Sequence, residues 1–143
     1  MSHKHVLLAE DNPAERRMIC EAFAAVDAAT KFTCVTTARE VVEYMSGDGV
    51  FDLSFALIDL HLADGGGQEL LRELSENPQM RMLPVIVFSG TTDPADVIKC
   101  YNSGASAFVS KPDDMEGYRR AAQAMSDFWL DINVTAKPEV SLF

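Results

Sequence analysis

The sequence predicts an α/β fold in which helices cover both faces of a parallel sheet. Five short apolar runs alternate with segments whose apolar residues recur at helical spacing. The run at 55–58 is apolar throughout, which is typical of a strand in a parallel sheet covered on both faces. Five βα units in one chain of 143 residues favour a single doubly wound, flavodoxin-like (βα)5 sandwich with strand order 2-1-3-4-5.

The first half of the chain predicts two strands and two helices. The apolar run 5–9 is followed by Asn12, Pro13 and Glu15, which predict a helix start with a capping box. The next elements expected are a strand at 32–35 and a helix that begins with a second capping box at Thr37 and Glu40 and ends at 47–49.

The second half predicts three more strands, at 55–58, 85–88 and 107–109. Three helices follow them, each with an apolar face expected to turn inward. These faces are Leu70, Leu71 and Leu74 in the third helix; Val97, Ile98 and Tyr101 in the fourth, which starts near Asp93; and Ala121, Ala122, Met125, Phe128 and Trp129 in the fifth, which runs from about 113 to 132.

Composition and charge exclude several classes of partner. The net charge of −10 argues against nucleic acid and anionic membranes, and it suits a basic partner or a divalent cation. No apolar run approaches a membrane span, and the N-terminus lacks a signal-peptide pattern, so a cytoplasmic protein is expected. The widely spaced Cys20, Cys34 and Cys100 are expected to be reduced, buried thiols.

The residues that directly follow the strands carry the functional information, because ligands of doubly wound folds bind at the carboxyl ends of the strands. These residues are Glu10 and Asp11 after the first strand, Asp59 after the third, Ser89 and Gly90 after the fourth, and Lys111 after the fifth. Any one of them alone is more often a turn or a helix cap. Their joint occurrence in this order is much rarer.

Three carboxylates at one edge repel one another and raise one another's pKa values. A hard cation such as Mg²⁺ would relieve this repulsion, and so would the ammonium of Lys111. Ser89 adds a hydroxyl donor. This set suits phosphoryl transfer onto Asp59 as an aspartyl-phosphate, with the cation and the lysine neutralising the phosphoryl oxygens.

Four segments, LLAEDN, ALIDLHLADGGGQELL, VIVFSG and GASAFVSKP, resemble the receiver domains of two-component response regulators. The resemblance spans about residues 5–128. It implies that Asp59 accepts a phosphoryl group from a sensor histidine kinase or phosphotransfer protein. It also implies a site for Mg²⁺ (or Mn²⁺) and a switch. The implied residues are Glu10, Asp11, Asp59 and the backbone carbonyl of His61 for the metal; Ser89, Gly90, Phe108 and Lys111 for phosphoryl binding and switching; and a cis Lys111-Pro112 bond.

The loop after Asp59 departs from the family pattern. Ala63 stands where proline is typical, and with Gly65, Gly66 and Gly67 beside it we expect a more mobile loop. His61 is expected to be a solvent-exposed loop side chain, and the alternative is a residue that alters the rate of dephosphorylation.

The C-terminal segment SKPDDMEGYRRAAQAMSDFWL resembles stand-alone receivers associated with bacterial phytochrome kinases. That resemblance implies a receiver domain at 1–132, an extension at 133–143 and a homodimer. With so short an extension, output by protein contact is expected. Interface candidates are Phe128, Trp129, Leu130, Ile132 and Val134. The alternative is a helix that ends in its own core, followed by a frayed tail.

Four other functions compete with a phosphorylatable receiver. An aspartyl-nucleophile phosphatase typically has a second Asp two residues after the nucleophile, where this chain has His61. A flavodoxin-like binding module would need a phosphate-cradling loop in place of Glu10 and Asp11. A degenerate scaffold would lack part of the site. A receiver that only drains phosphoryl groups, without output, is the fourth. We therefore expect a receiver and not a turnover enzyme.

Overall fold

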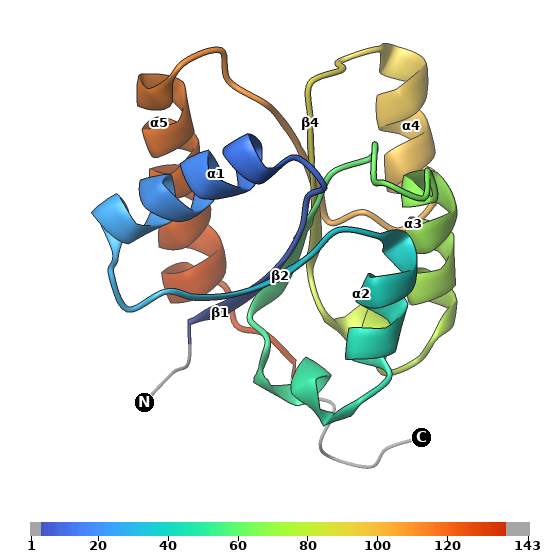
Figure 1. Ribbon diagram of the computed structural model, residues 1–143. Coiled ribbons are helices and arrows are strands. Elements are labelled where there is room, and N and C mark those ends of the chain that lie inside the picture. The colour runs from blue at the N-terminus through green and yellow to red at the C-terminus, as the bar shows by residue number, and fades with distance from the viewer. Residues whose placement is uncertain (1–3, 137–143) are drawn as a thin grey trace.

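A parallel five-stranded sheet with the order β2-β1-β3-β4-β5 forms the centre of the computed structural model, which describes residues 4–136 (Figure 1). The strands are β1 (His5–Ala9), β2 (Lys31–Val35), β3 (Phe55–Ile58), β4 (Val85–Ser89) and β5 (Ala107–Ser110). Every neighbouring pair is parallel. The predicted fold class and strand order are confirmed.

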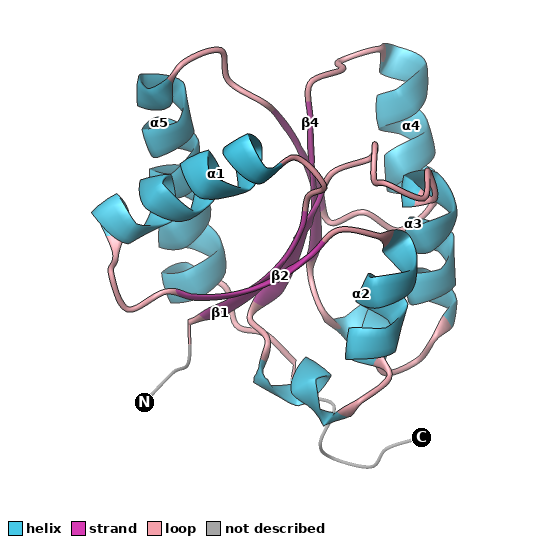
Figure 2. Cartoon of the chain, viewed as in Figure 1, coloured by secondary structure: helices cyan, strands magenta, loops and turns pink. Residues whose placement is uncertain are grey.

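Helices cover both faces of the sheet (Figure 1, Figure 2). The first layer consists of α1 (Pro13–Val26) and α5 (Met115–Met125); the second consists of α2 (Ala38–Met45), α3 (Gly67–Glu76) and α4 (Pro94–Asn102). Short 3₁₀ turns at Asp48–Asp52 and Met80–Met82 precede β3 and β4. Within residues 4–136, no helix has the length and apolar character needed to cross a bilayer.

Alternation along each strand divides the core into two halves. In β1, Val6 and Leu8 pack with α1 and α5, whereas Leu7 and Ala9 pack with α2 and α3. All four are at most 1% exposed. Burying a large aliphatic side chain contributes about 1.5–3 kcal/mol, so both helical layers gain from the same strand. This explains the unbroken apolar run.

Helix α1 begins at Asn12, whose side chain accepts hydrogen bonds from the backbone N–H groups of Ala14 and Glu15. The predicted N-cap is therefore confirmed, but the reciprocal half of the capping box is wrong. The N–H of Asn12 donates to Glu10 at 3.2 Å, and the carboxylate of Glu15 binds Lys111. The two acids around the cap are thus directed toward the end of the sheet.

Helix α4 buries a different line of residues from the one predicted. Ile98 is 59% exposed and Tyr101 is 50% exposed, whereas Cys100 is completely buried and Val97 is half-buried. The small thiol of Cys100 faces the core beside α3, where the side-chain amide of Gln68 contacts it. Relative to the prediction, α4 is therefore rotated about its own axis by about one residue. Two of the residues expected to point inward, Ile98 and Tyr101, lie at the surface.

The chain leaves α5 as a π-helix over Ser126–Ile132. Winding with i→i+5 hydrogen bonds, such as the one from Asn133 N–H to the carbonyl of Phe128, moves the inward position from i+4 to i+5. Leu130, five residues after the buried Met125, is therefore buried, while Phe128 is 46% exposed. The expected inward position of Phe128 is wrong, and Leu130 is a core residue instead of an interface candidate.

The cysteines are less alike than expected. Cys100 is buried, Cys20 is half-buried and Cys34 is exposed. Burial and the adjacent Cys34 thiol, to which it is hydrogen-bonded, raise the pKa of Cys20 to about 11. All three are free thiols, so the expected reduced state agrees with the structure while the expected common burial does not.

Candidate functional site

The sheet itself places three of the predicted site residues at one edge. Glu10, Asp59 and Lys111 directly follow β1, β3 and β5, and each continues the backbone ladder with one more hydrogen bond. The N–H groups donate to the carbonyls of Val35 at 3.0 Å, Ala9 at 3.0 Å and Ser89 at 2.8 Å, in that order. The backbone of the site is therefore held as rigidly as the strands.

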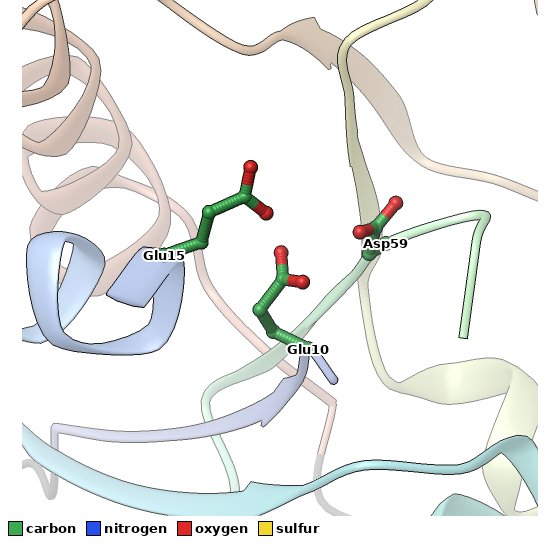
Figure 3. A group of neighbouring side chains, drawn as sticks. All are labelled: Glu10, Glu15 and Asp59. Atoms are coloured by element: carbon green, nitrogen blue, oxygen red, sulfur yellow. The ribbon is translucent and has the colours of Figure 1, made fainter. Parts of the chain in front are cut away.

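The ammonium of Lys111 lies at the centre of the site. Its Nζ donates to Oε1 of Glu10 at 2.9 Å, Oδ2 of Asp59 at 2.9 Å and Oε2 of Glu15 at 2.6 Å. An ammonium has three N–H donors, so all of them are used. Figure 3 shows the three carboxylates turned toward a common space between α1 and the end of β3.

These contacts decide the charge of the lysine. Burial alone would lower the pKa of Lys111, but hydrogen bonds to Glu15, Glu10 and Asp59 outweigh it and raise that pKa above its ordinary value of 10.5. Lys111 is therefore a fixed positive charge at physiological pH, which is the state that a phosphoryl-binding lysine needs.

The surroundings of Glu10 disfavour its ionised form. Glu10 is 1% exposed, and burial raises the pKa of its carboxyl from 4.5 to about 8, with Asp59 acting in the same direction and Lys111 against it. One lysine does not compensate for the loss of water around this carboxylate. A stronger positive charge at this edge would return Glu10 to its ionised form.

Asp59 is held in a single orientation. It is 6% exposed, its Oδ2 accepts from Lys111, and its Oδ1 accepts from the backbone N–H of His61 at 3.0 Å. A carboxylate fixed by two donors has a defined orientation at the carboxyl end of the sheet, which is a requirement for a nucleophile. The side chain of His61 is exposed, as expected.

The donor set suits a hard divalent cation. Carboxylate oxygens of Glu10, Glu15 and Asp59 lie within 4.8 Å of one another, and Mg²⁺ and Mn²⁺ prefer oxygen ligands. Asp11, the other predicted metal ligand, is exposed and lies outside this group. Glu15, which was expected only as a helix cap, lies inside it. Its position in the first turn of α1 was the signal available in the sequence.

The predicted switch residues lie on β4, which neighbours β3 and Asp59, and on β5, the next strand. The side chain of Ser89 is completely buried, and its Oγ accepts from Thr91 N–H at 3.3 Å. Phe108 packs against the core, and its N–H donates to the hydroxyl of Tyr101 at 3.1 Å. Gly90 is exposed directly after β4, and a Cβ at this position would meet no other atom within 4 Å.

The expected cis bond between Lys111 and Pro112 is wrong, because the described residues contain no cis peptide. The trans form is the intrinsically favoured one, by about 0.5–1 kcal/mol for an X-Pro bond. Lys111 reaches all three carboxylates with its following peptide in the trans form.

The loop after Asp59 is tied to α2. The carboxylate of Asp64 accepts from the N–H groups of Ala38 at 3.0 Å and Arg39 at 3.2 Å, and these bonds lower the pKa of Asp64. Gly67 permits the close approach of α3, since a Cβ there would lie 2.3 Å from the carbonyl oxygen of Leu60. Glycine at this position is therefore a packing requirement beside the acceptor.

Comparison with known proteins identifies a family and similar chains. The model of the response regulator receiver domain matches residues 6–123. The Probable methanogenesis regulatory protein FilR2 of Methanothrix harundinacea is 25% identical over 136 residues, which cover 93% of this chain and 88% of FilR2. Response regulator Rcp1 of Synechocystis sp. is 24% identical over 132 residues, which cover 90% of each chain.

Solved structures of related proteins have the same fold. The phosphorylated cyanobacterial phytochrome response regulator RcpA superposes with a TM-score of 0.84 at 26% identity, over 93% of this chain and 98% of its own. The Mn²⁺-bound form of Rcp1 superposes with a TM-score of 0.81 at 23% identity, over 93% and 99%. The expected resemblance to phytochrome-associated regulators is confirmed by RcpA. Because the family match extends through all five strands and most of the sequence, the chain belongs to the response regulator receiver domain family.

Proposed function

We propose that this receiver accepts a phosphoryl group on Asp59 from a sensor histidine kinase or a phosphotransfer protein, and that it signals through contacts with other proteins. The observation that carries the proposal is the position of Lys111, whose ammonium joins Asp59 and Glu10 at the ends of three different strands. A lysine fixed 2.9 Å from the acceptor carboxylate is in place to neutralise a phosphoryl group attached there.

In the proposed reaction, a carboxylate oxygen of Asp59 forms a bond to phosphorus while the bond between phosphorus and the donor's imidazole nitrogen breaks. The donor imidazole, which already carries a proton on its other nitrogen, keeps the electrons of the broken bond and leaves as a neutral ring, and Asp59 carries the phosphoryl group as an acyl phosphate. Lys111 donates to a phosphoryl oxygen as negative charge develops. The buried surroundings of Glu10 and Asp59 strengthen these interactions by excluding water.

A divalent cation, Mg²⁺ or Mn²⁺, is part of the proposal. Glu10, Asp59, Asp11 and the backbone carbonyl of His61 are the groups that we expect to hold it. The Mn²⁺-bound form of the similar protein Rcp1 supports a divalent cation as the ligand. Bound there, the cation would neutralise phosphoryl oxygens. Its charge would also favour the ionised form of Glu10, whose pKa is raised to about 8.

The signal would leave the site through Ser89 and Phe108. We expect the buried hydroxyl of Ser89 to exchange its bond with Thr91 N–H for one with a phosphoryl oxygen. Phe108 lies on the neighbouring strand, hydrogen-bonded through its backbone to Tyr101 of α4. Movement at Ser89 can therefore reach the half-exposed surface of α4, where Ile98 and Tyr101 lie.

Incubation with acetyl phosphate and Mg²⁺, followed by intact-mass analysis, tests the proposal. The wild type should gain one phosphoryl group, and Asp59→Asn should gain none. Asp48→Asn, which removes an exposed acid from the opposite edge of the sheet, is the matched control and should behave as the wild type. Undiminished phosphorylation of Asp59→Asn would contradict the assignment. Steady turnover of a phosphomonoester would instead favour an aspartyl phosphatase.

A homodimer through the C-terminal segment is the second part of the proposal. Three of the five interface candidates, Phe128, Ile132 and Val134, are 46%, 68% and 93% exposed, whereas Trp129 is half-buried and Leu130 is buried. The residues of the predicted extension at 137–143 lie outside the described part of the chain. Sedimentation with and without beryllofluoride and Mg²⁺ tests assembly, and a monomer under both conditions would contradict it.

A further inference from the structure

Glu15 is a fourth acid at the site, in addition to the three expected from the strand ends. It lies in the first turn of α1, and its side chain is 32% exposed. Its Oε2 is 2.6 Å from Nζ of Lys111, which is shorter than either of the other two bonds to that ammonium. Charge-assisted hydrogen bonds of this length are among the stronger ones in proteins.

The other two partners of Lys111 are residues that a divalent cation would also need. Glu10 and Asp59 each give one carboxylate oxygen to the ammonium, and both residues are almost completely buried. A cation and an ammonium cannot occupy the same space between two carboxylates, because their charges repel. The hydrogen bonds from Lys111 to Glu10 and Asp59 must therefore lengthen or break when a cation binds.

Glu15 differs from these two in its position. It projects from α1 rather than from a strand end, so its carboxylate reaches the site from the helix side of Glu10 and Asp59 (Figure 3). An ammonium that moves away from Glu10 and Asp59 toward Glu15 keeps one strong partner. It also remains next to the acceptor, because its backbone is fixed to Ser89 by the sheet.

We propose that Glu15 is a positioning residue for Lys111. It holds the ammonium on the α1 side of the site while a divalent cation takes Glu10 and Asp59, and it keeps Lys111 within reach of the incoming phosphoryl group. This inference rests on the function proposed above. It concerns the competition between the lysine and the cation, and it does not make Glu15 a ligand of the cation.

Removing the charge of Glu15 should weaken cation binding. In Glu15→Gln, Lys111 loses its charged partner on the helix side and binds Glu10 and Asp59 more tightly, so the cation competes less well. Loss of a group that supports metal ligands from outside the coordination sphere typically weakens metal affinity 10–100-fold, and we expect about a tenfold weaker Mn²⁺ affinity. Phosphorylation by acetyl phosphate should slow by a similar factor at limiting Mg²⁺ and recover at high Mg²⁺.

Titration of the full chain with Mn²⁺, monitored by electron paramagnetic resonance, measures this affinity without requiring phosphorylation. Glu21→Gln is the matched control, because it removes the same charge from an exposed position of the same helix. We expect wild-type affinity in this control. A Glu15→Gln variant that binds Mn²⁺ within about twofold of the wild type would overturn the inference.

A double-mutant cycle separates positioning from direct ligation. Lys111→Met should by itself bind Mn²⁺ more tightly, because a competing charge is gone. Adding Glu15→Gln to it should then change the affinity less than about threefold, since no ammonium remains to be held. A tenfold loss that persists in the Lys111→Met background would show that Glu15 acts on the cation itself and would overturn the inference.

The proposed function and the inference about Glu15 can be refuted independently of each other. If the wild type binds Mn²⁺ and is phosphorylated on Asp59 while Glu15→Gln equals the wild type, only the inference about Glu15 is wrong. If the wild type neither binds Mn²⁺ nor accepts a phosphoryl group, both are wrong.

Discussion

Replacing Glu10 with glutamine should stabilise the cation-free protein even though it removes a residue of the site. Glu10 is 1% exposed, and burial raises the pKa of its carboxyl from 4.5 to about 8. At neutral pH the unfolded chain has an ionised Glu10, and the folded chain binds a proton there. Folding therefore takes up a proton, and the free energy of unfolding decreases as the pH rises from 4.5 toward 8.

The size of the effect follows from this difference in pKa. Linkage gives a loss of stability of about 1 kcal/mol at about pH 5 and about 3 kcal/mol at about pH 7. Glutamine does not titrate, so the Glu10→Gln variant does not lose stability as the pH rises. Its single acceptor oxygen cannot accept from both Lys111 and the N–H of Asn12, and the lost hydrogen bond costs about 1 kcal/mol. We expect almost no change at about pH 5 and a gain of about 2 kcal/mol at about pH 7. Lys111, whose pKa is raised above 10.5, does not titrate in this range.

Urea unfolding in the presence of a chelator measures the difference, with the fluorescence of Trp129, the only tryptophan, as the signal. Glu21→Gln removes an exposed acid and should change stability by less than about 0.5 kcal/mol at either pH. Excess Mg²⁺ should reverse the order, since it binds the folded wild type and stabilises it. The reasoning is refuted if Glu10→Gln is less stable than the wild type at neutral pH, or if the gap does not widen with pH.

Three further predictions concern packing. Gly67→Ala should lower the free energy of unfolding by about 1–3 kcal/mol and slow phosphorylation, because its Cβ would lie 2.3 Å from the carbonyl oxygen of Leu60, next to the acceptor; urea unfolding and intact-mass kinetics check both effects. Leu130→Ala should cost about 2–3 kcal/mol, and Phe128→Ala less than about 1 kcal/mol, as measured on the monomer at low concentration; equal costs would contradict the assignment of the π-helix. Ile98→Ser should change stability by less than about 0.5 kcal/mol, and a larger loss in thermal unfolding would mean that α4 is packed as the sequence suggested.

The site residues that could be predicted from sequence are those whose position depends on the sheet. In a parallel sheet, the residue after each strand lies at the same edge whatever the intervening helices do. Glu10, Asp59 and Lys111 therefore met as expected once the strands and their order were known. Asp11, one residue beyond the ladder, is exposed and does not join them.

Helix faces were harder to predict, because several apolar residues compete to face the core. In α4, Cys100 faces inward in preference to Ile98 and Tyr101, and hydropathy alone does not distinguish these choices. After α5, the change from α to π winding moves the buried position from Phe128 to Leu130. No local motif marks that change, since its hydrogen bonds depend on how the segment packs beneath the sheet.

Glu15 shows why the local interpretation of a motif can fail. Asn12, Pro13 and Glu15 fit a capping box, in which the glutamate side chain is fixed in one conformation and accepts from one backbone N–H. A buried ammonium within reach offers a stronger, charge-assisted bond, and the N–H of Asn12 is satisfied by Glu10 instead. The long-range partner therefore outcompetes the local one. An acid in the first turn of the first helix is consequently better interpreted together with the lysine after the fifth strand than with its own helix cap, because only the folded sheet brings the two within 2.6 Å.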